Sequence, residues 1–455
     1  MVYQKIFNAP PIWARDMSDR SLVREVIRIS WPMIISELSD SLYSIADTFF
    51  VSKLGTAALA GVGIGSYLSW LFFVIIVPFS VGLLIYVAQS YGAKELHKAR
   101  KAIGETIIYS LLVTFIVSQL VHYNSLPLIS LIAGPSSEVI ENGVAYFSMR
   151  ILGLPLMATA FLMDSSLRAI GATKYSMVAI LSSTTLNIVL DPILIFGLFG
   201  IPSLGVKGAA LATVLSIAYL VPLEFFFLKL TGIAPIFSFK EKYVTKIIRL
   251  GTPTAIERAI HSIGGNVYIA FIARCGEVAL AAHQIGIRIE SFIYMPGFAF
   301  MVAASSLVGQ RIGSGNIGEA KKVCWETAKV ATAVMTLLGL IAAITSYYIV
   351  KPFSPTEKVA ELAAIYLILA GLSEPGLALA MTLSGGIRGG GNTVVPMAIN
   401  AVGLYSFRII PAAILIGFLG VIGAWTAMFI DVYLRGIIFA IVFKKFFTKL
   451  ARKVV

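Results

Sequence analysis

Residues 55–65 read GTAALAGVGIG, and residues 276–286 read GEVALAAHQIG. Outward from these segments, residues 31–101 align without a gap to residues 252–322 at a constant offset of 221, and 17 of the 71 aligned pairs are identical. The identical pairs include Pro32 with Pro253 and Gly92 with Gly313. The chain therefore contains two copies of one module. In a membrane chain, such a duplication is typical of a transporter whose substrate path lies between the copies.

The composition predicts an all-α integral membrane protein. Of the 455 residues, 58% are hydrophobic and 13% are charged, and the mean hydropathy is +0.88. Soluble domains carry about 25% charged residues, so this chain has more apolar surface than a water-soluble core can bury. Apolar runs long enough to span a bilayer recur along nearly the whole sequence. We expect no cleavable signal peptide, because the first 29 residues are polar and amphipathic.

The remaining composition argues against several other classes. The net charge of +13 comes from Lys and Arg in short loops between apolar runs, which favours topology signals over nucleic-acid binding. Cys275 and Cys324 lack metal or redox spacing, and the four histidines lack ligand spacing. We therefore expect no resident metal, no cofactor and no enzyme activity. The doubled module, with no filter-like segment, also disfavours a channel.

We predict twelve membrane-spanning helices in two six-helix lobes. Because six spans separate the two copies, both enter the membrane in the same orientation, as parallel repeats related by an axis along the membrane normal. The predicted spans lie near residues 29–51, 58–88, 102–130, 138–168, 175–200, 205–230, 247–272, 278–307, 323–349, 357–386, 394–418 and 421–446.

Lysines and arginines concentrate at both ends of the chain and in the second, sixth and eighth connections, whereas the odd-numbered connections hold few. The positive-inside rule then places both termini in the cytoplasm of a multi-pass cytoplasmic (inner or plasma) membrane protein. We expect a cytoplasmic amphipathic segment at 1–28, a first lobe at 29–232, a cytoplasmic linker at 233–246, a second lobe at 247–446 and a basic tail at 447–455.

Ionisable residues within predicted spans are candidates for function, because burying a charge in a membrane is costly. At 1.5 Å per residue, Asp40 lies about 15 Å into the first span, near the midplane. Asn187 and Asp191 are four residues apart and share a helix face. The acids within predicted spans that we consider as candidates are Glu37, Asp40, Asp47, Asp164, Asp191, Glu224, Glu257, Glu290, Glu374 and Asp431.

We hypothesise that Asp40, Asn187, Asp191 and a tyrosine such as Tyr146 form one buried polar cluster in the first lobe. Such a cluster binds H⁺ or Na⁺, because a carboxylate at low dielectric is stabilised by neutralisation. The alternative is an interhelical hydrogen-bond clamp. Asp47 and Asp164 lie nearer the ends of their spans, where either role fits. Glu224 and Asp431 lie close to loops, which favours a place at interfaces.

The second lobe carries different charges. Asp40 aligns with His261, and Glu290 aligns with Ser69, so the two copies share a skeleton but not their chemistry. Glu257, Glu290 and Glu374 are the candidates for an alternative cation site in this lobe. Arg258 and Arg288 lie nearby in the sequence, which fits a structural ion-pair network equally well.

Several motifs in this order resemble the multidrug and toxic compound extrusion (MATE) family. Residues 40–51 read DSLYSIADTFFV and precede Leu54 and Gly55. Residues 88–93 read AQSYGA, and their copy at 309–314 reads GQRIGS. The loops at 167–173 (LRAIGAT) and 387–393 (IRGGGNT) also repeat. The resemblance covers nearly the whole chain.

This resemblance implies twelve helices in a V with a central cleft, and efflux of small organic, often cationic compounds in exchange for H⁺ or Na⁺. It implies a monomer surrounded by membrane lipids. In the branch similar to DinF and the archaeal members, Asp40, Asn187, Asp191, Tyr146 and Asp164 would form the coupling site, with Na⁺ held by Asp40, Asn187 and Asp191. Asp164 departs from the asparagine common in relatives. A NorM-like site would use Glu257, which Glu374 complements only loosely.

Aromatic residues are candidates for contacting a flat cationic substrate. The four that we single out are Tyr43, Trp70, Phe161 and Phe292. The alternative function is a flippase for lipid-linked oligosaccharide or polyisoprenoid precursors, which would favour a cationic cavity for a pyrophosphate. The acidic residues predicted inside the first lobe disfavour it.

Overall fold

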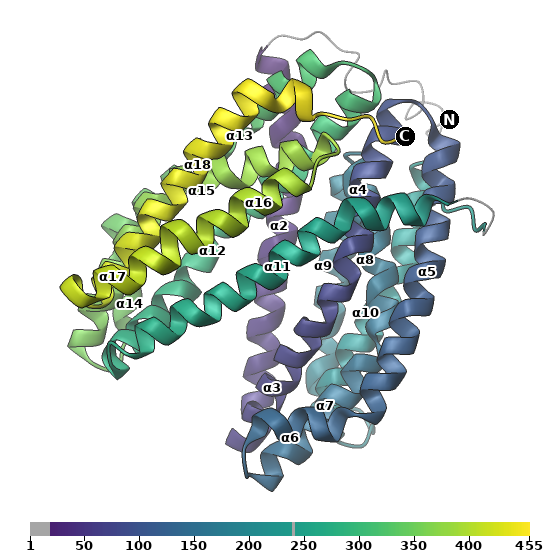
Figure 1. Ribbon diagram of the computed structural model, residues 1–455. Coiled ribbons are helices and arrows are strands. Elements are labelled where there is room, and N and C mark those ends of the chain that lie inside the picture. The colour runs from purple at the N-terminus through teal and green to yellow at the C-terminus, as the bar shows by residue number, and fades with distance from the viewer. Residues whose placement is uncertain (1–18, 239–241) are drawn as a thin grey trace. The chain divides into compact units, whose positions relative to one another are not determined.

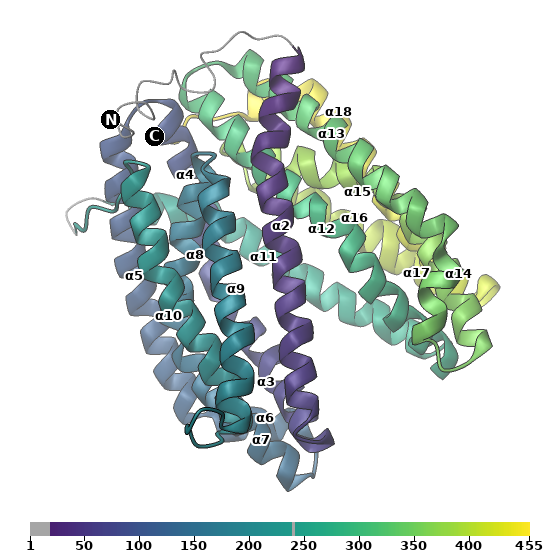
Figure 2. The same ribbon diagram turned by 180° about the vertical axis from the view of Figure 1, so that it is seen from behind.

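The computed structural model describes residues 19–238 and 242–455, and within these ranges it contains helices and turns but no strand. The helices are drawn in Figure 1 and, from behind, in Figure 2. Those of the first copy are α2 (Asp19–Ser52), α3 (Thr56–Phe73), η2 (Val74–Ile76), α4 (Val77–Gly92), α5 (Leu96–Tyr123), α6 (Ser125–Ala133), α7 (Ser137–Leu152), α8 (Leu154–Ala169), α9 (Thr173–Phe196) and α10 (Val206–Leu230).

The helices of the second copy are α11 (Tyr243–Ala273), α12 (Glu277–Gly313), α13 (Ile317–Ile344), α14 (Ser346–Val350), η3 (Lys351–Phe353), α15 (Glu357–Gly389), α16 (Val394–Gly403), η4 (Leu404–Ile409), α17 (Ile410–Leu419) and α18 (Val421–Leu450). The segment η4 is a π-helix and joins α16 to α17 in one continuous run. Most of the predicted amino-terminal segment, and part of the predicted linker, lie outside the described residues.

In the described chain, nine helical segments are long and apolar enough to cross a membrane, and the bent pair α7 and α8 makes a tenth. With 34 and 31 residues, α2 and α11 are also long enough, although they do not meet the same test of composition. Polar residues such as Asp40 and Glu257 interrupt their apolar runs. Each of the twelve predicted spans coincides with one of these segments. The predicted all-helical membrane fold is confirmed.

Two equivalent glycines explain why the repeat begins its second helix identically in each copy. Gly55 precedes α3 with a φ of 110°, and Gly276 precedes α12 with a φ of 104°. This region of backbone conformation is open to glycine and strained for residues with a Cβ atom. The turn between the first two helices of each module therefore requires glycine, which accounts for the matched pair in the sequence.

A second equivalent pair packs against equivalent tyrosines. A Cβ atom on Gly65 would lie 2.8 Å from the ring of Tyr146, and one on Gly286 would lie 2.1 Å from the ring of Tyr366. Both tyrosines are buried. In each copy, one buried tyrosine ring thus packs directly against one glycine. Tyr146 and Tyr366 consequently hold the same place in the two halves of the fold.

A third pair of equivalent glycines makes reciprocal contacts. A Cβ atom on Gly92 would lie 1.8 Å from the carbonyl oxygen of Gln310, and one on Gly313 would lie 1.9 Å from the carbonyl oxygen of Gln89. Backbone meets backbone at both points, so a larger residue has no flexible side chain to displace. The carboxyl-terminal ends of α4 and α12, which are equivalent in the sequence repeat, therefore make equivalent contacts with each other.

We expect Gly313→Ala to lower the stability of the fold by about 1–3 kcal/mol, because the added methyl group forces a backbone shift. The measurement is thermal unfolding of the purified protein in detergent. Gly63→Ala is the matched control, since a Cβ atom at exposed Gly63 would meet nothing within 4 Å. Equal unfolding temperatures for the two variants would contradict the close approach.

Gln89 forms hydrogen bonds with the residues that follow α18. Its Nε2 donates to the carbonyl oxygens of Gly389 at 3.0 Å and Arg452 at 3.2 Å. Its Oε1 accepts from the backbone N–H of Val454 at 2.8 Å. The backbone N–H of Arg452 also donates to the carbonyl oxygen of Gly390 at 2.7 Å. The end of the described chain is therefore held in place by a buried amide.

Contacts between residues divide the chain into two compact units. The first-lobe unit contains residues 35–87 and 95–255, and the second-lobe unit contains residues 88–94, 256–455 and, of the described residues, 19–34. The helix α2 passes between units after Ile34, and α11 does so after Ala255. These positions are equivalent in the repeat, and each follows an equivalent proline, Pro32 or Pro253, by two residues. Because a proline within a helix removes a backbone hydrogen bond, both crossings lie next to weakened helix.

Candidate functional site

Four helices of the first-lobe unit bring a set of polar side chains together. Asn187 and Asp191 lie one turn apart on α9, as their spacing predicts, and both are buried. Asn187 donates to Asp191 Oδ2 at 3.3 Å and accepts from the backbone N–H of Thr213 at 3.2 Å. We name the set the Asp191 cluster; its members are Tyr43, Asp47, Tyr146, Arg150, Asn187, Asp191 and Thr213.

The tyrosines of this cluster are fixed by hydroxyl groups. The hydroxyl groups of Tyr43 on α2 and Thr213 on α10 lie 2.8 Å apart. The hydroxyl group of Tyr146 on α7 accepts a hydrogen bond from Ser66 Oγ at 3.3 Å. The ring of Tyr146 also packs against Gly65, so one contact at the hydroxyl group and one at the ring fix its position.

Arg150 and Asp47 supply the remaining charges. Arg150 on α7 interacts electrostatically with Tyr43, Tyr146 and Asp47, and hydrogen bonds with Tyr146. Asp47 on α2 interacts in turn with Asp191. The cluster thus holds two carboxyl groups and one guanidinium group, so one carboxylate lacks a matching positive charge.

Each of these two carboxyl groups keeps one oxygen uncommitted. Asp47 Oδ1 and Asp191 Oδ1 are buried, and neither has a hydrogen-bond partner among the described residues. An unpaired carboxylate in an interior of low dielectric constant is unfavourable unless it binds a proton or a cation. The arrangement is therefore suited to H⁺ or to Na⁺, whose ligands are oxygen atoms. The described residues contain no group of three or more His, Cys, Asp or Glu side chains placed to hold a metal.

The predicted coupling residues do not all lie at one site in the structure. Tyr146, Asn187 and Asp191 lie in the Asp191 cluster. Asp40 is part of α2, but its side chain lies outside the described residues. Asp164 belongs to a separate group of charges on α8. Asp47, weighed in the sequence as a residue near the end of its span, lies in the Asp191 cluster.

Asp164 belongs to a group that we name the Arg168 cluster: Glu37, Asp164, Arg168, Ser176 and Glu224. Arg168 forms ion pairs with Asp164 Oδ2 at 2.6 Å and with Glu37 Oε1 at 2.9 Å. Ser176 donates a short hydrogen bond to Asp164. Asp164 therefore has two fixed contacts, one with Arg168 and one with Ser176. Glu224, expected at an interface, is fully buried beside them.

Glu257 of the second-lobe unit is also held by an arginine. Arg388 Nη2 contacts Glu257 Oε1 at 2.8 Å and Oε2 at 2.9 Å, and Asn400 Nδ2 donates to Oε1 at 2.7 Å. Glu37 and Arg168 are separated by 131 residues, and so are Glu257 and Arg388. The two lobes thus repeat one ion pair between their first and fourth spans. The arginine paired with Glu257 is Arg388, on the fourth span of the second lobe.

A second network in this unit surrounds Asp431. Arg435 Nη2 contacts Asp431 Oδ2 at 2.6 Å, and Arg408 Nε donates to the same oxygen at 2.8 Å. Arg435 also donates to Asn400 Oδ1 at 3.4 Å, which joins this network to Glu257. Arg408 lies in the π-helix η4 and above the ring of Tyr268. Among the described residues, this joined network has three arginines and two carboxylates.

Glu290 and Glu374 form an acidic pair, and Glu290 also interacts electrostatically with Arg408 of the Asp431 network. Tyr366 donates a short hydrogen bond to Glu290. Glu374 is fully buried, and neither of its carboxyl oxygens has a hydrogen-bond partner in the described chain. The two acids interact electrostatically with each other and with Tyr294. Of the three second-lobe candidates, Glu290 and Glu374 therefore lie together, and Glu257 is occupied by Arg388.

The sequence model of one family, MatE, matches this chain twice, at residues 32–193 and 253–414. The two matches cover well over half of the chain and start 221 residues apart, the offset of the internal repeat. The chain belongs to the MatE family. It is a membrane transporter of the multidrug efflux class, and not an enzyme, as the sequence predicted.

Two relatives illustrate how differently the proteins similar to this MATE chain are named. It is 28% identical over 422 residues to the "Probable multidrug resistance protein NorM" of Thermotoga maritima, with 90% of each chain covered. It is 25% identical over 353 residues to the "FAD transporter" of Shewanella oneidensis, covering 76% of this chain and 77% of the relative. The relatives therefore include proteins named for drugs and one named for an anionic cofactor.

Solved structures confirm the MATE fold. A mutant of the Vibrio cholerae MATE transporter VcmN is similar with a TM-score of 0.89 at 18% identity, covering 95% of this chain and 99% of that chain. The agreement extends over nearly the full length of both chains. It confirms the two-lobe helical architecture expected from the sequence.

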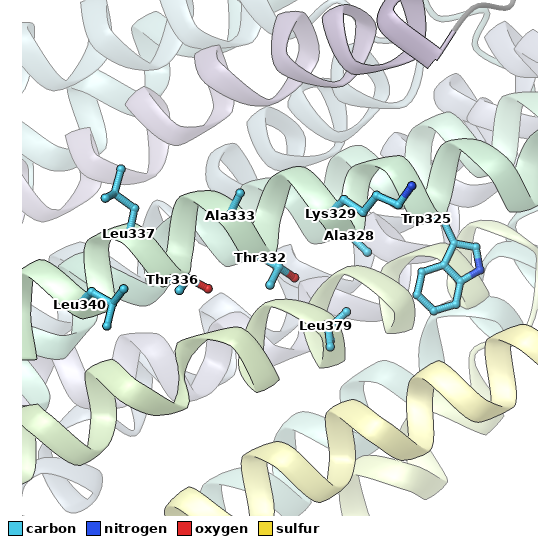
Figure 3. A pocket seen from close by; sticks show the side chains of 9 residues that line it. All are labelled: Trp325, Ala328, Lys329, Thr332, Ala333, Thr336, Leu337, Leu340 and Leu379. Atoms are coloured by element: carbon cyan, nitrogen blue, oxygen red, sulfur yellow. The ribbon is translucent and has the colours of Figure 1, made fainter.

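The aromatic residues predicted to contact substrate are scattered over the MATE fold. Tyr43 is committed to the Asp191 cluster. Trp70, Phe161 and Phe292 are exposed, and the ring of Phe161 meets that of Phe73 edge-on at 4.9 Å. A groove of about 560 Å³ runs between α13 and α15, with Trp325 and Lys329 toward one end and Leu340 toward the other (Figure 3). None of the four predicted aromatic residues lines this groove.

Of the charged residues in the Asp191 and Arg168 clusters, Arg150 was not predicted from the sequence, and Glu224 was expected at an interface. Arg150 lies on α7, three residues before the 50° bend between α7 and α8, and carries no motif. Glu224 lies near the end of its span, and the sequence gives no sign that it is fully buried. Both follow from helix packing. For Asp47 a signal did exist, because it shares a helix face with Asp40 seven residues earlier.

Proposed function

We propose that this MATE protein is a secondary active transporter that exports small organic, often cationic compounds in exchange for H⁺ or Na⁺. The observation that supports this most directly is the pair of uncommitted carboxyl oxygens on Asp47 and Asp191, buried together beside Asn187. Coupling requires a group whose charge changes when the ion binds. These two carboxyl groups meet that requirement.

The proposed cycle is alternating access. In the state open to the outside, substrate leaves while the Asp191 cluster takes up H⁺ or Na⁺. Neutralisation removes the charge penalty of the unpaired carboxylate, and α2, α9 and α10 repack around it. The lobes then expose the site to the cytoplasm, where the ion leaves and a new substrate binds. We propose that both termini face the cytoplasm, in line with the positions of the lysines and arginines.

A second candidate function is export of an anionic compound. Around Asp431 and Glu257 in the described chain lie three arginines, of which Arg408 also interacts electrostatically with Glu290. Arginine side chains recognise phosphate and carboxylate groups through paired hydrogen bonds, so this region motivates a test of phosphate-containing or carboxylate-containing solutes. The relative named as an FAD transporter motivates a test of flavin nucleotides next to organic cations.

The deciding experiment is efflux of a fluorescent organic cation from proteoliposomes under an imposed pH or Na⁺ gradient. We expect one of the two gradients to drive export. Asp40→Asn tests whether Asp40 takes part in coupling together with the Asp191 cluster. If it does, we expect this variant to lose the response of efflux to that gradient. Survival of the response would leave Asp47 and Asp191 as the coupling pair. If neither gradient drives any cation, and flavin nucleotides move instead, the cation proposal is overturned.

A further inference from the structure

Glu224 on α10 is a fully buried acid that the proposed exchange does not use. Its side chain has no exposure to solvent, and neither Oε1 nor Oε2 has a hydrogen-bond partner among the described residues. An ionised carboxylate in such a place is strongly disfavoured, and the group escapes that cost by holding a proton. The surroundings therefore favour the neutral acid.

The charges near Glu224 explain why its carboxyl group has no positive group of its own. It interacts electrostatically with Asp164 and Arg168 of α8. Arg168 already forms ion pairs with Asp164 and with Glu37 of α2. One guanidinium group thus serves three carboxyl groups.

Within the described residues, Arg168 is the positive group that interacts with Glu224. On α9, Ser176 donates to Asp164, Tyr175 packs against Phe227 of α10, and Lys174 is exposed. On α7, Arg150 is engaged with Tyr43 and Tyr146 in the Asp191 cluster. Glu224 is therefore the third carboxyl group of a cluster with one arginine.

The internal repeat shows that the fold does not need an acid at this position. Residues 204–209 (LGVKGA) align with residues 419–424 (LGVIGA), an offset of 215. This alignment places Glu224 opposite Phe439, which is buried in the core of the second lobe. Where one lobe has an aromatic core residue, the other has an acid without a partner. Selection for packing alone does not account for that difference.

A line of polar groups lies between the Arg168 cluster and the Asp191 cluster within the first-lobe unit. Ser176 and Asp191 lie on the same helix, α9, with Ser183 and Asn187 between them, and all four are buried. Ser183 donates to the carbonyl oxygen of Ser216 on α10 at 2.8 Å. Buried hydroxyl and amide groups of α9 therefore lie along the helix between the two clusters.

We propose that Glu224 is a second proton-binding residue of the first lobe, which releases its proton at the end of the lobe where α8 and α10 terminate. In the release step the carboxylic acid of Glu224 gives H⁺ to water and becomes a carboxylate next to Arg168. Only the direction of release rests on the proposed exchange; the proton on Glu224 does not.

The first test reads the proton itself and does not depend on transport. Infrared spectra of the purified wild-type protein should contain a carbonyl band from a protonated carboxyl group without a hydrogen bond. Because Glu374 is also fully buried without a hydrogen-bond partner in the described chain, we expect Glu224→Gln to weaken this band and the double variant with Glu374→Gln to lack it, whereas Asp191→Asn keeps it. Identical spectra for the wild type and Glu224→Gln would overturn the proposal.

The second test measures its role in coupling. In proteoliposomes we expect Glu224→Gln to reduce proton-driven accumulation about tenfold, while exchange of labelled for unlabelled substrate stays within about twofold of wild type. Glu224→Phe installs the residue found at the equivalent position and should fold and show the same split. Proton-driven accumulation at the wild-type level in both variants would overturn the proposal. If the wild type itself ignores the pH gradient, the exchange proposal fails, and the infrared result still decides the proton on Glu224.

Discussion

Asp191→Asn is expected to abolish the ability of an imposed ion gradient to concentrate substrate. Asparagine keeps the size of the side chain but cannot change its charge, so the first lobe loses the distinction between loaded and unloaded states. A gradient of about two pH units supports about a 100-fold concentration ratio when one proton is exchanged per substrate, because each tenfold ratio requires about 1.4 kcal/mol. The variant should support no ratio above one.

The measurement is the steady-state ratio of a fluorescent cation across proteoliposome membranes. Asp47→Asn should behave in the same way, since Asp47 interacts directly with Asp191. Glu141→Gln on the exposed face of α7 is the control, because it removes the same kind of charge from a solvated position. A wild-type ratio in Asp191→Asn, together with a lost ratio in Glu374→Gln, would move coupling to the second lobe.

Arg168→Leu should destabilise the protein by about 3–5 kcal/mol, because it leaves the buried Asp164 and the partly buried Glu37 without their positive partner. We expect a large drop in the thermal unfolding temperature in detergent and a poor yield of folded protein. Arg274→Leu, the same replacement in an exposed turn, should have little effect.

Two further variants distinguish an ion pair from simple loss of packing. Adding Glu37→Gln and Asp164→Asn to Arg168→Leu removes the unpaired charges and should recover most of the lost stability. Arg388→Leu should produce a similar defect in the second lobe, because it removes the arginine paired with Glu257. No recovery in the triple variant would show that Arg168 acts through packing and not through charge.

The architecture could be read from the sequence because its signals are local or repeated. The apolar runs predict the spans, and Gly55 and Gly276 match because both occupy a backbone conformation that only glycine adopts easily. The face shared by Asn187 and Asp191 follows from helical spacing alone. Such features need no knowledge of which helix lies next to which.

The partners of the buried charges could not be read in this way. Arg168 finds Glu37 across 131 residues of sequence, and Arg388 finds Glu257 across the same interval. Nothing in the local sequence distinguishes an acid with an arginine beside it, such as Glu257, from one without, such as Glu374. The choice of Asp40 over Asp47 rested on depth along a straight helix, whereas membership of the Asp191 cluster depends on how α2 packs against α7 and α9.

The length of α9 between its two clusters has an electrical consequence. Ser176 and Asp191 are fifteen residues apart, about 22 Å along the helix axis, while the hydrocarbon core of a bilayer is about 30 Å thick. A charge that enters at one cluster and leaves at the other crosses most of the membrane field. A potential of 100 mV is worth about 2.3 kcal/mol for one elementary charge across the full membrane. Voltage therefore adds to the driving force when the exchange moves net charge, and it adds nothing when one ion is exchanged for one monovalent cation.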